Sequence, residues 1–250
     1  NHIQLSQKCI VPLFESKPDY DVMYLIAKSV GLESVLPEDA EQLARFQIDE
    51  ATDPLVAGIT FDALVQNHNT MPLAGIGEPR IGHADLQFPT STGRMEIYYE
   101  PQHHSGQALP QWEENNEVFD GNPLMEKYPL QLAQTRTRFF VHSHFRGAAG
   151  LAQFYTPRIE LNPQAMAERG LEDGDAVEVF NDRGSFSCQA FGNNAIRPTS
   201  ARIYEAAWSK DCISGNPQNV TNDHVNERDA DLLTGAPIPF NDTLVEVRKA

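Results

Sequence analysis

Apolar residues in the first third of the chain recur at helical spacing in three stretches, over residues 19–30, 37–46 and 61–65. Gly31 follows the first stretch, where a helix commonly ends. Acidic residues open the second stretch, and Thr60 precedes the third at the position of a helix N-cap. The pattern therefore predicts three short helices before residue 70.

The pattern then changes. Residues 68–85 are rich in Gly and Pro, which is typical of irregular loop. Two short apolar runs within residues 86–99 flank Gly93, so we predict a β-hairpin there. A long polar stretch follows it. We place the main boundary at its end, which gives an α+β segment over residues 1–126 and a second domain over residues 127–250.

Short strands dominate the expected second domain. Apolar runs at 129–133 and 139–141 predict two strands joined by a polar connection. Asn162 and Pro163 are typical of the start of a helix, and Gly170 of its end.

Alternation of apolar and polar residues predicts further strands after this helix, at 176–180, 186–191, 201–208 and 244–248. Gly184 lies in the turn between the first two, where we expect a positive φ. Short strands with one small inserted helix favour a closed β-barrel over a sandwich.

Charge is distributed unevenly along the 250 residues. The chain has 35 Asp and Glu against 19 Lys and Arg, yet no carboxylate lies between Glu126 and Glu160. This window holds Lys127, Arg136, Arg138, His142, His144, Arg146 and Arg158. Forked guanidinium groups suit phosphate oxygens, so the window predicts a small anionic ligand. The net charge of −16 argues against nucleic acid as a partner. From charge alone, a solvated basic hairpin without a ligand stays open.

A second candidate site is the amide-rich loop at 214–222. Asn216, Asn219 and Asn222 can each donate and accept hydrogen bonds, which suits the edge of a heteroaromatic base or a pterin. The alternative is a series of turns that asparagine and glycine favour for their own backbone geometry.

Metal and membrane signals are weak. Cys9, Cys188 and Cys212 are sparse and are not spaced as zinc or iron–sulfur ligands, which favours isolated thiols. His142 and His144 alternate at a predicted strand end, where polar contacts are more typical than metal ligation. No run of 18 apolar residues occurs, so we expect no direct membrane insertion. The first residues have the appearance of a piece of a longer chain.

Five segments together resemble a known domain. In chain order they are PLQLAQTRTRFFVHSHF, TPRIELNPQAMAERGLEDGDAVEVFNDRGSF, IRPTSARIYEAAW, SGNPQNVTN and NDTLVEVRK. They are similar to the molybdopterin-dinucleotide-binding domain at the C-terminus of catalytic subunits of the dimethyl sulfoxide reductase family. Gln164-Ala165 replaces the acidic pair usual in that family, and Leu171 replaces Ile. The resemblance covers residues 127–250, while QLSQKCIVPLFESKPDYDVMYLIAKSVG resembles the part that precedes this domain.

The resemblance implies a fold, a cofactor and a site. The fold would be a six-stranded double-psi β-barrel preceded by an α+β segment, and the cofactor a bis(molybdopterin guanine dinucleotide), or bis-MGD, carrying molybdenum or tungsten. The family's cofactor loops, carried onto this chain, give Gln134, Thr135, Arg136, Arg138, His142, Ser143, Asn216, Asn219 and Asn222. Pro217 and Gln218 interrupt the family's Gly-rich approach to the late loop, which puts the last two asparagines in doubt.

The implied function is that of a C-terminal fragment of an oxidoreductase similar to anaerobic dimethyl sulfoxide reductases, which act in anaerobic respiration. Family partners would be the rest of the catalytic subunit, together with an iron–sulfur electron-transfer subunit. A 4Fe–4S cluster would lie upstream, and the complex would be extracytoplasmic or membrane-associated. The metal ligand would also lie upstream, so we expect the fragment alone to be inactive. Two alternatives remain: a non-redox hydratase or transhydroxylase of the same family, and an interaction module that has lost the cofactor. We expect loss of Arg138 to weaken cofactor retention, and loss of Arg183, in the turn after residue 180, to have little effect.

Overall fold

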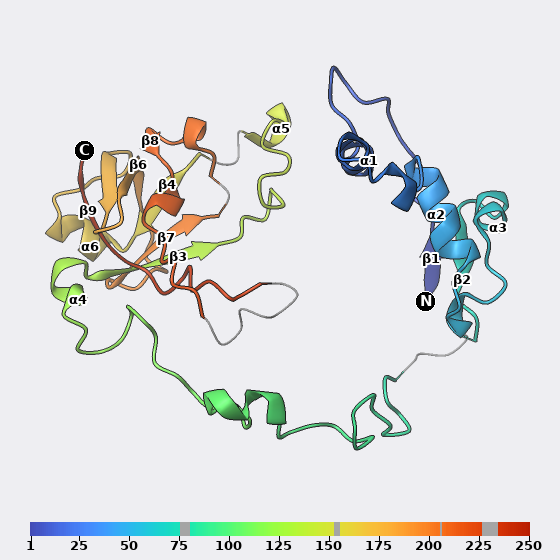
Figure 1. Ribbon diagram of the computed structural model, residues 1–250. Coiled ribbons are helices and arrows are strands. Elements are labelled where there is room, and N and C mark those ends of the chain that lie inside the picture. The colour runs from blue at the N-terminus through green and yellow to red at the C-terminus, as the bar shows by residue number, and fades with distance from the viewer. Residues whose placement is uncertain (76–80, 153–155, 206, 227–234) are drawn as a thin grey trace. The chain divides into compact units, whose positions relative to one another are not determined.

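The computed structural model describes residues 1–75, 81–152, 156–205, 207–226 and 235–250. Its contacts divide the chain into two compact units, Asn1–Glu96 and Ile97–Ala250. Figure 1 shows helices in the first unit and most of the strands in the second. The two units are described separately below.

Three α-helices are the main regular elements of the first unit, and the sequence predicted all three. They are α1 (Asp19–Ser29), α2 (Ala40–Asp49) and α3 (Phe61–Gln66). The second helix begins later than predicted because the Asp39 side chain accepts a hydrogen bond from the Gln42 N–H and caps it. Thr60 caps α3 as expected, accepting from the Ala63 N–H at 3.1 Å.

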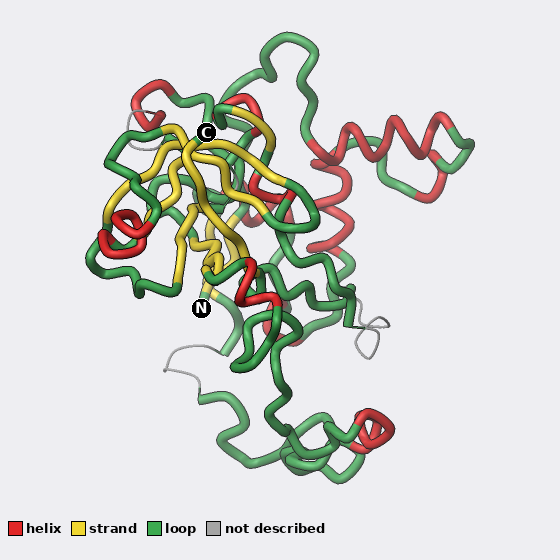
Figure 2. Tube along the Cα trace, turned by 90° about the vertical axis from the view of Figure 1, so that its left-hand side faces the viewer, coloured by secondary structure: helices red, strands yellow, loops and turns green. Residues whose placement is uncertain are grey.

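The other elements of the first unit are short. Two 3-10 turns, η1 (Glu33–Val35) and η2 (Pro54–Val56), lie between the helices. Figure 2 shows the helices and strands of the chain joined by long loops. Strands β1 (His2–Gln4) and β2 (Thr70–Pro72) form an antiparallel pair.

The hairpin predicted at 86–99 is wrong. No strand occurs between residues 81 and 99, which form bends and turns. Gly93 does have a positive φ, of 67°, and its carbonyl accepts a hydrogen bond from the Phe88 N–H. Met95 and Ile97 are exposed, so the apolar alternation here finds no sheet or core to pack against.

Six strands of the second unit close into a barrel. They are β3 (Leu130–Thr135), β4 (Arg158–Leu161), β5 (Ala176–Phe180), β6 (Ser185–Gly192), β7 (Ser200–Tyr204) and β9 (Leu244–Lys249). The order is β4-β7-β3-β9-β5-β6, and β6 pairs back onto β4 to close the ring. The pairs β3–β7 and β4–β6 are parallel and the others antiparallel. The two-residue strand β8 (Ser214–Gly215) adds to β6 outside the ring. The predicted double-psi β-barrel is confirmed.

Alternation along the strands fills the barrel. In β3 and β7 every second residue is buried, which places Leu130, Leu132 and Ile203 inside. The helix α6 (Pro163–Glu168) begins after Asn162, whose side chain accepts from the Gln164 N–H as the sequence predicted. This helix contributes Met166 to the same core.

Two local predictions in the second unit are wrong. Residues 139–141 form no strand, because Val141 makes only an isolated bridge to His144 and is exposed. Gly184 does not have a positive φ. A Cβ at this position would lie 3.0 Å from the Asn219 carbonyl oxygen, so close approach of the backbone is what favours glycine.

The segment before the barrel is attached to it. This segment contains the 3-10 helix η3 (Glu100–Ser105) and the helix α4 (Leu124–Lys127). The buried carboxylate of Asp242 accepts hydrogen bonds from the N–H groups of Asn116, Glu117 and Val118. Glu117 in turn accepts from the Leu244 N–H at 3.0 Å. Contacts thus assign residues 97–126 to the barrel unit, while the independent folding of 127–250 stays a prediction.

Candidate functional site

The candidate site begins where two parallel strands end together. Strands β3 and β7 pair in parallel up to Thr135 and Tyr204, so the residues after them emerge at the same edge of the barrel. The Glu205 N–H donates to the Thr135 carbonyl at 2.9 Å and extends this pairing by one step. Arg136 and Glu205 are thereby brought side by side, although 69 positions in the sequence separate them.

A pocket of about 290 Å³ lies at this edge. Its lining combines amides, a hydroxyl, a carboxylate, an imidazole and two apolar side chains: Gln134, His142, Glu205, Gln218, Thr221, Ile238 and Phe240. Such a mixture of donors, acceptors and apolar surface is typical of a site for a polar heteroaromatic group.

Gln134 is the buried anchor of the pocket, with 6% of its surface exposed. Its amide nitrogen donates to Thr221 Oγ1 at 2.7 Å, and its amide oxygen accepts from Gln218 Nε2 at 3.3 Å. Its backbone N–H donates to Asn241 Oδ1 at 2.7 Å. These bonds fix Gln134 between the late loop and the segment that precedes β9, so the pocket wall is held in place from both sides.

Acidic residues from outside the cationic window offset most of its charge. Glu205 Oε1 lies 3.4 Å from Arg136 Nε and 3.5 Å from His142 Nδ1. Other pairs join Lys127 to Asp182, Arg146 to Asp211 and Arg158 to Glu160. Arg138 differs, because no carboxylate of the described residues lies within 4.0 Å of its side chain. Arg138 is therefore the strongest candidate for an external anion.

The three asparagines of the late loop use their amides within the protein. Asn216 caps the 3-10 helix η5 (Pro217–Asn219) by accepting from the Gln218 N–H, and its amide nitrogen donates to the Ala207 carbonyl. Asn219 donates to the Ser185 carbonyl. Asn222 is buried and donates to the Asp242 carbonyl at 2.7 Å. These contacts shape the loop, and direct binding of a ligand by the three amides stays a prediction.

The remaining predicted residues are Thr135 and Ser143. Thr135 Oγ1 is buried and has no hydrogen-bond partner among the described residues, so it is an orphaned polar atom beside the pocket. Ser143 is exposed in the turn after His142, whose φ of 51° is unusual for a residue other than glycine. The structure thus brings Gln134 and His142 to the pocket, with Arg136 against its Glu205.

No metal centre is found in the described part of the chain. None of its groups of three His, Cys, Asp or Glu could hold an ion. Burial raises the pKa of the Cys188 thiol to about 12, and also raises that of Cys212. Both groups are therefore neutral thiols near pH 7, which are poor ligands compared with thiolates. Likewise, no helix of the described residues has both the length and the apolar character that a membrane crossing requires.

Comparison with known proteins identifies the barrel. Residues 130–242 match the family described as a molybdopterin dinucleotide binding domain. Nearly the whole chain also aligns with catalytic subunits: 96% of it with a putative dimethyl sulfoxide reductase catalytic subunit of Halobacterium salinarum, at 27% identity. The barrel is thus similar to molybdopterin-dinucleotide-binding domains, and the chain as a whole is similar to a dimethyl sulfoxide reductase subunit.

Two further relatives align with the chain in the same way. Trimethylamine-N-oxide reductase 1 of Escherichia coli is 27% identical over 97% of the chain, and dimethyl sulfoxide/trimethylamine N-oxide reductase of Rhodobacter capsulatus is 29% identical over 81%. The chain spans between 27% and 32% of the length of these relatives. Among solved structures, acetylene hydratase from Pelobacter acetylenicus has a TM-score of 0.75 at 21% identity, covering all of this chain and 35% of its own, which shows a common fold.

Five residues of the pocket lining lie outside the predicted site: Glu205, Gln218, Thr221, Ile238 and Phe240. The sequence pattern places Glu205 inside a predicted strand and Gln218 at an interruption of the late loop. Parallel pairing of β3 with β7 decides the position of Glu205, and such pairing leaves no local signal in the sequence. The sequence signal for this site is an acidic residue, Glu205, directly after the alternating residues of β7, together with the basic Arg136 directly after β3.

Proposed function

We propose that this chain is part of the catalytic subunit of a molybdenum-dependent reductase that acts on S-oxides or N-oxides. The observation that carries the proposal is a polar pocket at the common end of β3 and β7, inside a domain of molybdopterin-dinucleotide-binding type. The relatives at 26–29% identity are reductases of dimethyl sulfoxide or trimethylamine N-oxide, which favours this substrate class.

The residues present fit a guanine dinucleotide of molybdopterin. The ligand would offer N–H donors, carbonyl acceptors and phosphates, and the pocket edge supplies carboxylate, amide and hydroxyl groups with the unpaired Arg138 nearby in sequence. The orphaned Thr135 hydroxyl adds one more donor that a ligand can satisfy. We infer that Gln134, Thr135, Arg136, Arg138, His142 and Ser143 form the cofactor loop, while Asn216, Asn219 and Asn222 keep the late loop in shape.

This chain would contribute binding and electrostatics to the reaction. The bound cofactor would supply the two-electron chemistry of the metal, molybdenum in the proposal and tungsten as the variant to test. Gln134 is held by three hydrogen bonds, so it can present a fixed amide without rearranging. Arg138 would hold a phosphate oxygen through a charge-assisted hydrogen bond. An upstream 4Fe–4S cluster and an electron-transfer subunit belong to the same proposal.

The alternative with the same fold is a hydration reaction without net redox change. The structural likeness to acetylene hydratase is at 21% identity, below that of the reductases, so we place the reductase first. The alternative without a cofactor is an interaction module. The orphaned Thr135 hydroxyl argues against it, because a buried polar atom without a protein partner is expected to find one in a ligand.

The test is cofactor retention in the complete enzyme to which this chain belongs. Arg138→Ala is expected to lower the guanine nucleotide released per protein by acid, since a charge-assisted hydrogen bond contributes about 1.5–3 kcal/mol. Arg197→Ala is the matched control, because Arg197 is an exposed barrel-unit arginine for which the described residues show no side-chain partner. Equal cofactor content in the two variants would contradict the proposal.

Arg183 is unsuitable as that control, while the expectation that its loss has little effect on cofactor retention stays a prediction. Its guanidinium donates to the Val220 carbonyl through Nε at 3.0 Å and Nη2 at 2.9 Å, and it forms an ion pair with Glu117. Loss of Arg183 would therefore loosen the late loop and the segment before the barrel together.

A further inference from the structure

The carboxylate in the pocket is unexpected for a phosphate site. Glu205 is 22% exposed in its side chain, and it lines the same pocket as Gln134 and His142. A phosphate placed there would meet a like charge, which disfavours binding. The pocket and Arg138 therefore favour ligand groups of different charge, although Arg138 follows the strand β3 that contributes Gln134 to the pocket.

Glu205 also has acceptor capacity to spare. An ionised carboxylate offers about four acceptor positions. Arg136 Nε and His142 Nδ1 approach one oxygen at 3.4 and 3.5 Å, and no hydrogen bond to either side-chain oxygen is made within the described residues. By contrast, the Thr221 hydroxyl donates to the Pro217 carbonyl at 3.1 Å while accepting from Gln134. The main unused acceptor of the pocket is therefore the carboxylate.

The surroundings of Glu205 suit a carboxylate that accepts hydrogen bonds from a ligand. Arg136 and His142 approach the carboxylate from the loop that follows β3, and the Glu205 backbone is fixed by its bond to the Thr135 carbonyl. Ile238 and Phe240 supply an apolar wall against which a flat ring can pack.

We propose that Glu205 selects ligands that carry a 2-amino-4-oxopyrimidine edge. This edge presents a ring N–H and an adjacent amino group, and two parallel N–H donors match the two oxygens of one carboxylate. Pterin and guanine, at the two ends of the cofactor, both carry this edge. It rests on the proposed function and adds a selecting residue to it.

The experiment uses the 250-residue chain and two matched pairs of probes in calorimetric titrations. Guanosine monophosphate is compared with inosine monophosphate, and pterin with lumazine; the second member of each pair lacks the 2-amino group. The wild-type chain is expected to bind the 2-amino member about ten-fold more tightly in at least one pair, as a site built to accept an N–H rejects the analogue without it.

Three variants test whether Glu205 selects the 2-amino group directly or only supports the structure of the pocket. Glu205→Gln is expected to bring this ratio close to one, because the amide replaces one acceptor by a donor. Glu205→Asp retains the charge and should recover part of the ratio. The control is Glu178→Gln, since Glu178 lies on β5 paired with Arg248, outside the pocket lining. The control should keep the full ratio, and circular dichroism verifies that each variant is folded.

Each outcome has a distinct meaning. Discrimination in the guanine pair alone assigns Glu205 to the nucleotide end, and discrimination in the pterin pair alone assigns it to the pterin end. Equal binding within both pairs, or a ratio that survives Glu205→Gln, overturns the inference but leaves the cofactor-retention test of Arg138 untouched. Failure of every probe to bind overturns both the inference and the use of this pocket as a ligand site.

Discussion

The helical first unit and the barrel unit bury their apolar residues very differently. None of the eleven residues of α1 is buried, and its apolar Val22, Leu25 and Ile26 are 40%, 46% and 53% exposed. In the barrel, Leu132 and Ile159 are completely buried. A helix depends on another surface to cover its apolar side, whereas a closed sheet provides its own interior.

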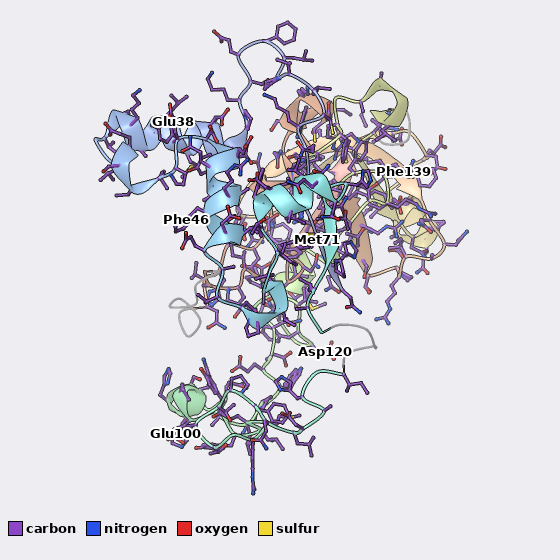
Figure 3. The ribbon with its side chains drawn as sticks, turned by 90° about the vertical axis from the view of Figure 1, so that its right-hand side faces the viewer. Glu38, Phe46, Met71, Glu100, Asp120 and Phe139 are labelled. Atoms are coloured by element: carbon purple, nitrogen blue, oxygen red, sulfur yellow. The ribbon has the colours of Figure 1, made fainter. Side chains whose placement is uncertain are left out.

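The difference shows what periodicity can and cannot reveal. Helical spacing in residues 19–30 correctly predicted α1, but it did not reveal whether a partner surface lies within this chain. Among the described residues of the first unit, the buried apolar side chains are Ile59, Phe61 and Leu64. Phe46 on α2 is 61% exposed (Figure 3). We therefore expect the barrel unit to carry most of the stability of the isolated chain.

The largest expected effect is a cavity in the barrel. Leu132→Ala should lower the free energy of unfolding by about 2–5 kcal/mol, since deleting a buried leucine side chain leaves space that neighbours fill only in part. Both tryptophans, Trp112 and Trp208, lie in the barrel unit, so tryptophan fluorescence during urea unfolding reports on it.

The matched change in the first unit is Leu25→Ala, followed by far-ultraviolet circular dichroism. It is expected to alter the free energy of unfolding by no more than about 0.5 kcal/mol, the usual range for surface substitutions. A loss as large as that of Leu132→Ala would mean that α1 is packed as tightly as the barrel, and the comparison would fail.

The next effect is the stability that residues 97–126 add to the barrel. A chain of residues 127–250 is expected to fold, because all six barrel strands lie within it, but to be less stable than residues 97–250. The shorter chain loses the N–H groups that donate hydrogen bonds to Asp242. It also loses the ion pair of Arg183 with Glu117. An unfolded product by circular dichroism would contradict the domain boundary predicted at residue 126.

Asp242→Asn sharpens this test. In residues 97–250 it should lower the free energy of unfolding by about 1–3 kcal/mol, because one carboxylate oxygen is replaced by a donor that faces N–H groups. In residues 127–250 the same change should have much less effect, since those N–H groups are absent. Asp223→Asn is the control in both chains, as Asp223 is an exposed aspartate of the same region. Equal costs in the two chains would show that Asp242 acts within the barrel alone.

A further effect, confined to alkaline pH, is a pH dependence of the stability of the barrel. Burial raises the pKa of Cys188 from its ordinary value of 9.0 to about 12, so the unfolded chain loses this proton first as the pH rises. The contribution to stability is complete below pH 9.0 and is lost as the pH approaches about 12. Urea unfolding of wild type and Cys188→Ala from pH 7 to 11 checks this. The wild type should show the steeper alkaline loss, and parallel curves would rule it out.

Thiol labelling gives a second measurement of the same residue. Cys9 is exposed and Cys188 buried, so Cys9 should react with a thiol reagent first and Cys188 only upon opening of the barrel. Rapid labelling of Cys188 in the folded chain would show that the barrel opens far more readily than its packing suggests.

The sequence by itself determined the local elements of this protein. The caps Thr60 and Asn162 act through neighbouring N–H groups, so they could be found without knowing the fold. Alternation predicted the strands β5, β6, β7 and β9, and the motif of the barrel indicated the family. Within the site, charge and resemblance pointed to Gln134, Arg136 and His142, which the structure places at or beside one pocket.

Tertiary structure decided everything that depends on which strands become neighbours. Apolar alternation at 86–99 and 139–141 produced no strands, because a strand requires a partner edge as well as a suitable pattern. Gly184 is needed for its approach to Asn219, and Arg183 for a carbonyl that lies 37 residues further along the chain. Glu205 joined the pocket only because β3 and β7 run in parallel, and this pairing connects residues too distant in sequence for any local pattern to record it.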